Sequence, residues 1–263
     1  MRLPVISGVI RRRLLVNFRV DADVMAGYLP APFRPKLHRG FAIAGICLIR
    51  LVEMRPRGLP DWCGISSENA AHRIAVVWDD LDGQTQEGVF VPRRDTGSRL
   101  NHLVGGRLFP GEHHLAKFDV EDDGARVAIS INASDGKMSI RLRGMESDAL
   151  PLASCFKSLA ESSAFFESGC VGYSVTRDGC RLDGIRLEML GWSVRPFGVE
   201  QVETSFFSDA TIFPVGSATF DHALIMRDIP HQWHVVPDMV TEQSTSQSAQ
   251  SIPADLEPVG ESA

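Results

Sequence analysis

The chain has 263 residues, 44% of them apolar, which is enough to bury one sizeable core or two small ones. Its net charge of −6 supplies no basic field for nucleic acid, so we expect no nucleic-acid partner. No apolar run approaches the roughly 18 residues of a membrane span, and the N-terminus lacks the apolar core of a signal peptide, so we expect a cytoplasmic protein with no membrane partner.

The first predicted elements are a strand and a short helix. Residues 13–20 alternate apolar and polar side chains, as a half-buried strand does. Asp21 is placed to cap a helix with apolar residues from Val24 to Tyr28, and Pro30 ends that helix. The basic run Arg11–Arg13 is interpreted as a solvated face.

Further strands follow in the first half of the chain. Residues 41–52 form a nearly continuous apolar run, which predicts a buried strand. Residues 66–78 end in a second apolar run, and 88–91 form a short strand. A polar, arginine-rich stretch then extends to Arg99.

The middle of the chain predicts an antiparallel meander. Residues 127–131 and 138–142 each alternate apolar and polar side chains. Asp-Gly turns at 122–124 and 134–136 precede these two segments, and such turns join antiparallel strands.

The last third combines a helix, more strands and a polar tail. Residues 150–168 carry apolar side chains every three to four positions, which predicts an amphipathic helix. Strand patterns resume between 171 and 226. We expect one domain over 1–237 and a disordered polar tail over 238–263, because the tail has too few large apolar residues to offset its ordering entropy.

The predicted fold is therefore mainly β (α+β), with antiparallel sheets and a few helices. It has no regular βαβ rhythm, which excludes a doubly wound nucleotide-binding sheet. It also has no glycine-rich phosphate motif, so we expect no cofactor.

One turn concentrates polar chemistry. Between Gly105 and Lys117 the sequence brings together Arg107, Glu112, His113 and His114. Adjacent residues on a strand point to opposite faces, so the two histidines would not share a metal ion, and we expect no metal site. The plain alternative is that one histidine is solvated and the other packs internally.

Arginines and one glutamate suggest an anionic ligand. Glu68 and Arg73 lie five residues apart in a strand-like run, and Arg94 and Arg107 lie in the polar region that follows. Arginine suits bidentate recognition of a carboxylate. The alternative for Glu68 and Arg73 is a surface pair that adds at most about 1 kcal/mol.

Four motifs occur in a fixed order: Val20–Val24 leading to Leu29-Pro30, then Phe41–Ala44, then Ser67-Glu68-Asn69 with Arg73, and then Gly106-Arg107 leading to Leu115-Ala116. This order resembles the acetoacetate decarboxylase-like superfamily and, within it, the YqjF-like bacterial branch, over roughly residues 10–237. The resemblance implies antiparallel sheets wrapped into a cone-like barrel around a central pocket. Members of this superfamily often assemble into homo-oligomers, a state that this sequence leaves open.

One departure from that superfamily bears on chemistry. Acetoacetate decarboxylases carry a lysine pair, one of which forms a Schiff base with a β-keto acid. Here His113-His114 stand just before the matching Leu115-Ala116. Imidazole cannot form the protonated imine, so we expect no Schiff-base decarboxylase, and Lys117 is a poorly placed substitute.

Three readings of function remain open. The first is a pocket that binds a small, anionic organic molecule through Arg107, Arg73 and Arg94, with acid–base chemistry of a lyase or hydrolase type by His113, His114 and Glu68. The second is a non-catalytic module that binds or senses a metabolite in the same pocket. The third is a structural or interaction protein whose pocket is filled.

Overall fold

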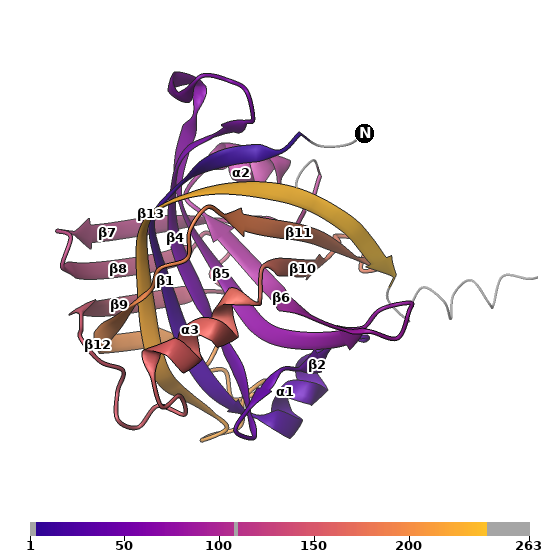
Figure 1. Ribbon diagram of the computed structural model, residues 1–263, viewed down its shortest axis with the longest axis vertical. Coiled ribbons are helices and arrows are strands. Elements are labelled where there is room, and N and C mark those ends of the chain that lie inside the picture. Colours follow the sequence, from indigo (N-terminus) through magenta and orange to yellow (C-terminus); the bar gives the residue numbers. More distant parts are fainter. Residues whose placement is uncertain (1–3, 108–109, 241–263) are drawn as a thin grey trace, which may run out of the picture.

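A computed structural model of the chain describes residues 4–107 and 110–240 (Figure 1). The described residues form one 13-stranded sheet with a few short helices. The part of the predicted polar tail from 241 onward lies outside the described residues, and residues 238–240 end the last strand. Among the described helices, none is both long and apolar enough to cross a membrane.

The strands are β1 (Ile6–Asp21), β2 (Arg34–Pro35), β3 (Leu37–His38), β4 (Phe41–Pro56), β5 (Ile65–Asp79), β6 (Thr85–Thr96), β7 (His113–Asp122), β8 (Arg126–Ala133), β9 (Ser139–Glu146), β10 (Val171–Val175), β11 (Arg181–Met189), β12 (Arg195–Thr204) and β13 (Ala218–Val240). The helices are α1 (Ala22–Tyr28), the 3-10 helix η1 (Asp61–Cys63), α2 (Arg99–Val104) and α3 (Leu159–Glu167).

The strand pairings close the sheet into two rings that share a wall. One ring, here the filled ring, runs through β6, β7, β8, β9, β12, β13, β1, β4 and β5 and back to β6. The other, here the hollow ring, uses the same β13, β1, β4, β5 and β6 but returns through β10 and β11. In Figure 1, β7–β9 and β12 lie on one side of the shared wall, and β10 and β11 lie on the other.

The mainly β class is confirmed, but the sheet is mixed rather than purely antiparallel. Strand β6 pairs parallel with both β7 and β10, while the other pairings are antiparallel. The two Asp-Gly turns join β7 to β8 and β8 to β9 as predicted. Asp21 caps α1, since its carboxylate accepts hydrogen bonds from the backbone N–H groups of Asp23 and Val24.

Two local expectations were wrong. The predicted helix over 150–168 is helical only in α3, because the Ser158 side chain accepts the N–H of Glu161 and caps the helix there. The strand predicted over 88–91 was too short, because β6 extends from Thr85 to Thr96 and includes part of the arginine-rich stretch.

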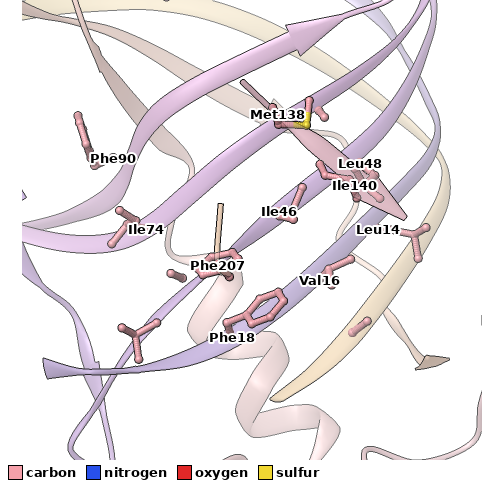
Figure 2. Packing of buried hydrophobic residues seen from close by; sticks show 14 of the residues in the cluster. Leu14, Val16, Phe18, Ile46, Leu48, Ile74, Phe90, Met138, Ile140 and Phe207 are labelled. Atoms are coloured by element: carbon pink, nitrogen blue, oxygen red, sulfur yellow. The ribbon is translucent and has the colours of Figure 1, made fainter. Parts of the chain in front are cut away.

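The filled ring is packed with apolar side chains from its whole circumference (Figure 2). Leu14 and Val16 of β1 meet Ile46 and Leu48 of β4, and Ile140 comes from β9. Phe207 enters from the β12–β13 connection and stacks on Phe18 at 4.1 Å between ring centroids. This ring therefore has the close packing of a protein interior.

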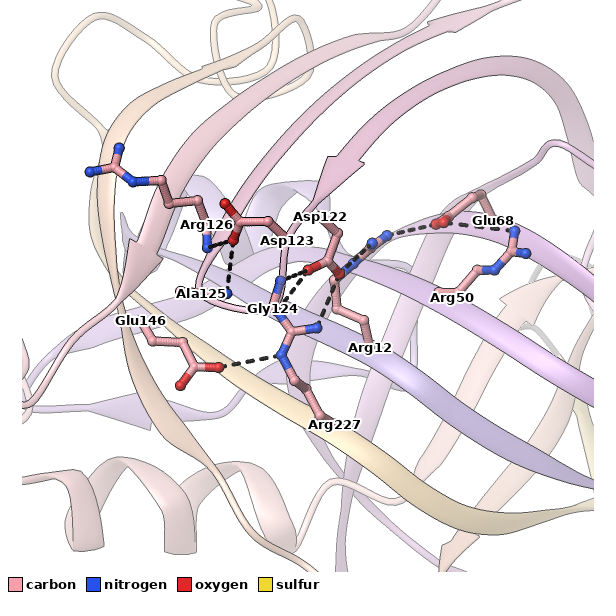
Figure 3. A network of polar contacts seen from close by, with 10 residues as sticks. All are labelled: Arg12, Arg50, Glu68, Asp122, Asp123, Gly124, Ala125, Arg126, Glu146 and Arg227. Atoms are coloured by element: carbon pink, nitrogen blue, oxygen red, sulfur yellow. Dashed lines mark hydrogen bonds and ion pairs between the residues drawn. The ribbon is translucent and has the colours of Figure 1, made fainter.

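One end of the filled ring is closed by a network of charges (Figure 3). Arg12 donates to Glu68 at 2.8 Å and to Asp122 at 3.1 Å. Asp122 also accepts from Arg227 at 3.0 Å, and Arg227 contacts Glu146 at 3.3 Å. Arg12 is only 2% exposed, so the interpretation of Arg11–Arg13 as a solvated face was wrong for Arg12.

Candidate functional site

The hollow ring encloses a cavity of about 470 Å³. The shared wall contributes Arg13 of β1, Cys47 and Ile49 of β4, and Asn69 of β5. Strand β13 of the shared wall contributes Trp233, and the return strand β11 contributes Ile185 and Leu187. Helix α2 covers one side with Leu100, Asn101 and Val104. A cavity of this size, with apolar walls and a few polar groups, is typical of small-molecule sites.

Alternation along the shared strands decides which neighbour faces the cavity. In β1, Arg12 points into the filled ring's charge network while Arg13 lines the cavity. In β5, Glu68 joins that network while Asn69 lines the cavity. Arg13 stands across from Ile49, and Ile49 stands across from Asn69, so these side chains form one row.

Arg94 is the most exceptional group in the cavity. Its Nε and Nη2 atoms are buried and have no hydrogen-bond partner among the described residues. Burial lowers the pKa of Arg94 to about 10, against the opposing effect of the Asp183 charge. The guanidinium therefore keeps its positive charge at pH 7.

Gly111 makes room for that guanidinium. A Cβ added to Gly111 would lie 2.3 Å from Arg94 Nε, and its φ of +81° already favours glycine. The backbone N–H of Gly111 donates to Asp183 at 2.9 Å, which fixes the turn against β11.

Arg13 is the second cation of the cavity. Its Nε donates to Cys47 Sγ at 3.2 Å, and its Nη1 donates to Met189 Sδ at 3.5 Å. Sulfur atoms are weak acceptors, so these contacts do not offset a full charge. Asp95, which also lines the cavity, is held by Arg93 through both carboxylate oxygens, so it offers Arg13 no free counter-charge.

His113 presents a neutral imidazole. Its Nδ1 lies 2.9 Å from the carbonyl of Gly111, and because a carbonyl only accepts, Nδ1 carries the proton. Burial, and then the charge of Arg94, lower the pKa of His113 to about 4. Only Nε2, with its lone pair, is left for a ligand. Gly105 leaves the space for this ring, since a Cβ there would lie 2.3 Å from His113 Nδ1.

The neutral polar groups of the cavity bind one another. Thr96 Oγ1 donates to Asn69 Oδ1 at 2.7 Å, and Asn69 Nδ2 donates to Ser67 Oγ at 2.9 Å. Asn101 Nδ2 donates to the same Ser67 Oγ at 3.1 Å, which ties α2 to β5. Arg94, Arg13 and His113 Nε2 are therefore polar groups of the cavity that a ligand can reach without displacing these bonds.

Of the six predicted site residues, the cavity brings together Arg94 and His113. His114 faces the other way, with Nδ1 3.6 Å from Asp135. Arg107 is exposed and donates to the carbonyl of Leu103 at 3.3 Å. Glu68 belongs to the charge network of Figure 3.

Arg73 lies in a separate, smaller cavity of about 40 Å³, which Arg13 also lines. Arg73 is 5% exposed, donates to Asn17 Oδ1, and stacks its guanidinium 4.7 Å from the ring centre of Phe166. Burial lowers its pKa to about 10. Arg73 is thus a buried cation beneath the large cavity.

The lysines lie elsewhere. The four lysines of the chain are all among the described residues, and none of them lines the large cavity. Lys117 is exposed on β7, as Lys137 and Lys157 are in their own segments, and Lys36 pairs with Glu87 at 2.6 Å. Within the described ranges, no three His, Cys, Asp or Glu side chains are grouped so that they could hold a metal ion.

Sequence reasoning missed Arg13, Asn69 and Asn101. Part of the signal for Arg13 was present, because Arg12 and Arg13 are neighbours on one strand and therefore cannot share one solvated face. Asn101 carries no such signal, because only the closing of the hollow ring brings α2 over β5.

A model of the DUF2071 family, described as "Uncharacterized conserved protein (COG2071)", matches residues 9–226. No curated protein matches the chain.

Solved structures share the fold at low sequence identity. Acetoacetate decarboxylase from Legionella pneumophila has a TM-score of 0.56 at 12% identity, over 90% of this chain and 88% of that chain. The enduracididine biosynthesis enzyme MppR has a TM-score of 0.55 at 10% identity, over 91% and 88%. An acetoacetate decarboxylase-like enzyme from Sphingomonas wittichii RW1 has a TM-score of 0.52 at 12% identity, over 90% and 91%. At such identities the likeness establishes an acetoacetate decarboxylase-like fold and nothing finer.

Proposed function

The chain belongs to the DUF2071 family, and from the hollow ring of its acetoacetate decarboxylase-like fold we propose that it binds a small organic anion. The ligand's carboxylate lies against Arg94 and Arg13, and its carbon skeleton lies against the apolar walls. The order of the sequence motifs supports a finer proposal, that the chain falls in the YqjF-like branch.

A single observation carries this proposal. Two buried N–H groups of Arg94 have no partner among the described residues, although unpaired buried donors are rare and costly. They belong to a charged group at the edge of a cavity large enough for a ligand. A carboxylate that enters the cavity supplies the missing acceptors, and its negative charge strengthens those hydrogen bonds.

Titration calorimetry with butanoate tests the proposal, with butanamide as its neutral counterpart. Wild-type protein binds butanoate and not butanamide. Arg94→Gln weakens butanoate binding roughly 10- to 100-fold, the range expected for lost hydrogen bonds to a charged group. Arg107→Gln, which removes an exposed arginine outside the cavity, leaves binding unchanged. Equal binding of butanoate by wild type and Arg94→Gln contradicts the proposal.

We propose a second activity for the same site, proton transfer by His113. The hydrogen bond from Nδ1 to the Gly111 carbonyl favours it, because that bond orients the ring and leaves Nε2 as a base. The chemistry that fits is removal of a proton from the carbon beside a carbonyl group of the bound anion. Glu68 is held by Arg12 and takes no part in this step.

Deuterium exchange distinguishes this activity from simple binding. In D2O, wild-type protein incorporates deuterium at the methyl group of pyruvate faster than buffer does, and His113→Gln loses that rate while it still binds pyruvate. His114→Gln, at the neighbouring position with its ring near Asp135, is the matched control. If wild type binds pyruvate without exchange, the protein is a binding or sensing module.

A further inference from the structure

The large cavity is open at one end and closed at the other. At the closed end Cys47, Ile49 and Leu187 are each 7–8% exposed. At the open end Ile65 is 38% exposed and Leu100 is 50% exposed. A ligand therefore enters beside the hairpin that joins β4 to β5, where α2 forms the opposite rim.

Polarity changes along the same axis. Arg13 and Arg94 lie at the closed end. Arg13 donates to Cys47 Sγ. Arg94 of β6 pairs with Ala71 of β5, which in turn pairs with Cys47 of β4. Toward the opening the lining is mostly apolar, with Leu51, Met54, Ile65 and Leu100. The neutral polar residues Ser67 and Asn101 also lie there, and they are hydrogen-bonded to each other.

One charged residue, Arg55, also lines the open end. Its guanidinium is already occupied, because it donates to Asp61 and to the carbonyls of Glu53 and Leu59. Arg55 therefore offers no competing site for an anion at the mouth.

The distance between the two ends of the cavity fits a ligand with a long alkyl chain rather than a compact ligand. Met54 lies seven residue steps beyond Cys47 on β4, and strands rise about 3.3 Å per residue, so the lined wall extends for roughly 20 Å. A two- or three-carbon acid bound to the arginines would leave most of this apolar wall uncovered.

We propose that the ligand is an amphiphilic acid, with its carboxylate at Arg94 and Arg13 and an unbranched alkyl chain of about six to ten carbons running out between β4, β5 and α2. This inference rests on the proposed function and adds the length and polarity of the ligand. The exposed apolar side chains at the mouth, Ile65 and Leu100, contact the end of the chain.

A chain-length series tests the inference. Butanoate, hexanoate, octanoate and decanoate, each kept below its micelle concentration, are titrated into wild-type protein. Burial of a methylene strengthens binding about 4-fold, so each two-carbon step lowers Kd roughly 16-fold until the chain leaves the cavity. Decanol, which lacks the charge, binds at least 10-fold more weakly than decanoate.

Two variants of α2 test where the alkyl chain of the ligand lies. Leu100→Ser weakens decanoate binding about 5-fold and leaves butanoate unchanged, because only the longer chain reaches the mouth. Leu103→Ser removes a similarly exposed leucine of the same helix that does not line the cavity, and it changes neither affinity.

The binding measurements distinguish a failure of the amphiphile proposal from a failure of the anion site. If butanoate binds through Arg94 but Kd does not fall with chain length, the amphiphile is ruled out and the anion site stands. If decanoate and decanol bind alike, and Arg94→Gln changes neither, the anion site itself is ruled out.

Discussion

The two rings share a wall, yet the charged side chains on its two sides have different partners. Arg12 and Arg13 are neighbours on β1, and alternation sends them to opposite sides. On the filled side, Arg12 meets Glu68 and Asp122 and closes a packed barrel. On the hollow side, Arg13 donates hydrogen bonds to the sulfur atoms of Cys47 and Met189, and Arg94 has two nitrogen donors without partners among the described residues.

The comparison separates buried charges that have partners among the described residues from a buried charge that has unpaired donors there. A buried charge with its partners in the same chain contributes to folding, and its loss leaves the partner uncompensated. A buried charge without a partner costs stability unless a ligand supplies the partner. The predictions below test this division, from the largest expected effect to the smallest.

The largest effect concerns Arg12. Arg12→Met leaves Glu68 and Asp122 without their shared cation in a half-buried site, so we expect the free energy of unfolding to fall by about 3 kcal/mol. Arg13→Met removes a cation with no carboxylate partner and changes that free energy by less than about 1 kcal/mol. Urea denaturation of both variants measures the difference. Equal decreases in the free energy of unfolding would contradict the distinction between paired and unpaired buried charges.

The second effect is a dependence of stability on pH. His72 lies on the filled side, fully buried against Phe206, and neither ring nitrogen is hydrogen-bonded to any residue that the structure describes. Burial, and then the charge of Arg93, lower the pKa of His72 to about 3. In the unfolded chain His72 has a pKa near 6.5, so it binds a proton at pH values where the folded state does not. The free energy of unfolding therefore falls as pH falls from about 6.5 toward 3.

His72→Phe tests this effect through the slope of stability against pH. Between pH 6 and pH 4 the variant loses about 1.4 kcal/mol less per pH unit than wild type, the contribution of one proton. Denaturation midpoints at several pH values give the slopes. Parallel curves would show that His72 does not govern this window.

The third effect concerns the turn that holds Arg94. Gly111→Ala places a Cβ against Arg94 Nε at a positive φ, so we expect a loss of about 1–2 kcal/mol in stability. The displaced guanidinium also binds butanoate more weakly. Gly136→Ala, at a φ of +70° with open space around it, is the matched control, because it carries the same backbone strain without the clash. Its butanoate affinity stays that of wild type.

The smallest expected effect is the absence of a covalent adduct. No lysine among the described residues lines the large cavity, so borohydride treatment in the presence of acetoacetate leaves the mass of the protein unchanged. Intact-protein mass spectrometry measures this. An adduct on Lys117 or any other lysine would contradict the expectation that this protein forms no Schiff base.

Local patterns in the sequence predicted much of the fold. The alternation in 127–131 and 138–142 and the Asp-Gly turns require only neighbours in the chain, and the meander β7–β9 follows from them. The parallel pairing of β6 with β7 and β10 was not predictable, because nothing in the sequence of β6 distinguishes a parallel from an antiparallel partner. The helix over 150–168 was overextended, because apolar spacing alone does not reveal the serine cap at Ser158.

The site was harder to predict than the fold. His113 and Arg94 were identified by residue type, and strand alternation separated His113 from His114 as expected. Glu68 and Arg13 were not separable from their neighbours without knowing which side of β1 and β5 was packed and which was hollow. That distinction is made by β10, β11 and α2, which lie far away in the sequence.

The most direct measurement is the NMR spectrum of the arginine Nε–H groups during a titration with butanoate. The account predicts that the Nε–H signal of Arg94 shifts downfield as a hydrogen bond to the carboxylate forms, while the signal of Arg12 stays in place. Signals that all stay in place while butanoate is present in excess, or a shift confined to Arg12, would contradict it.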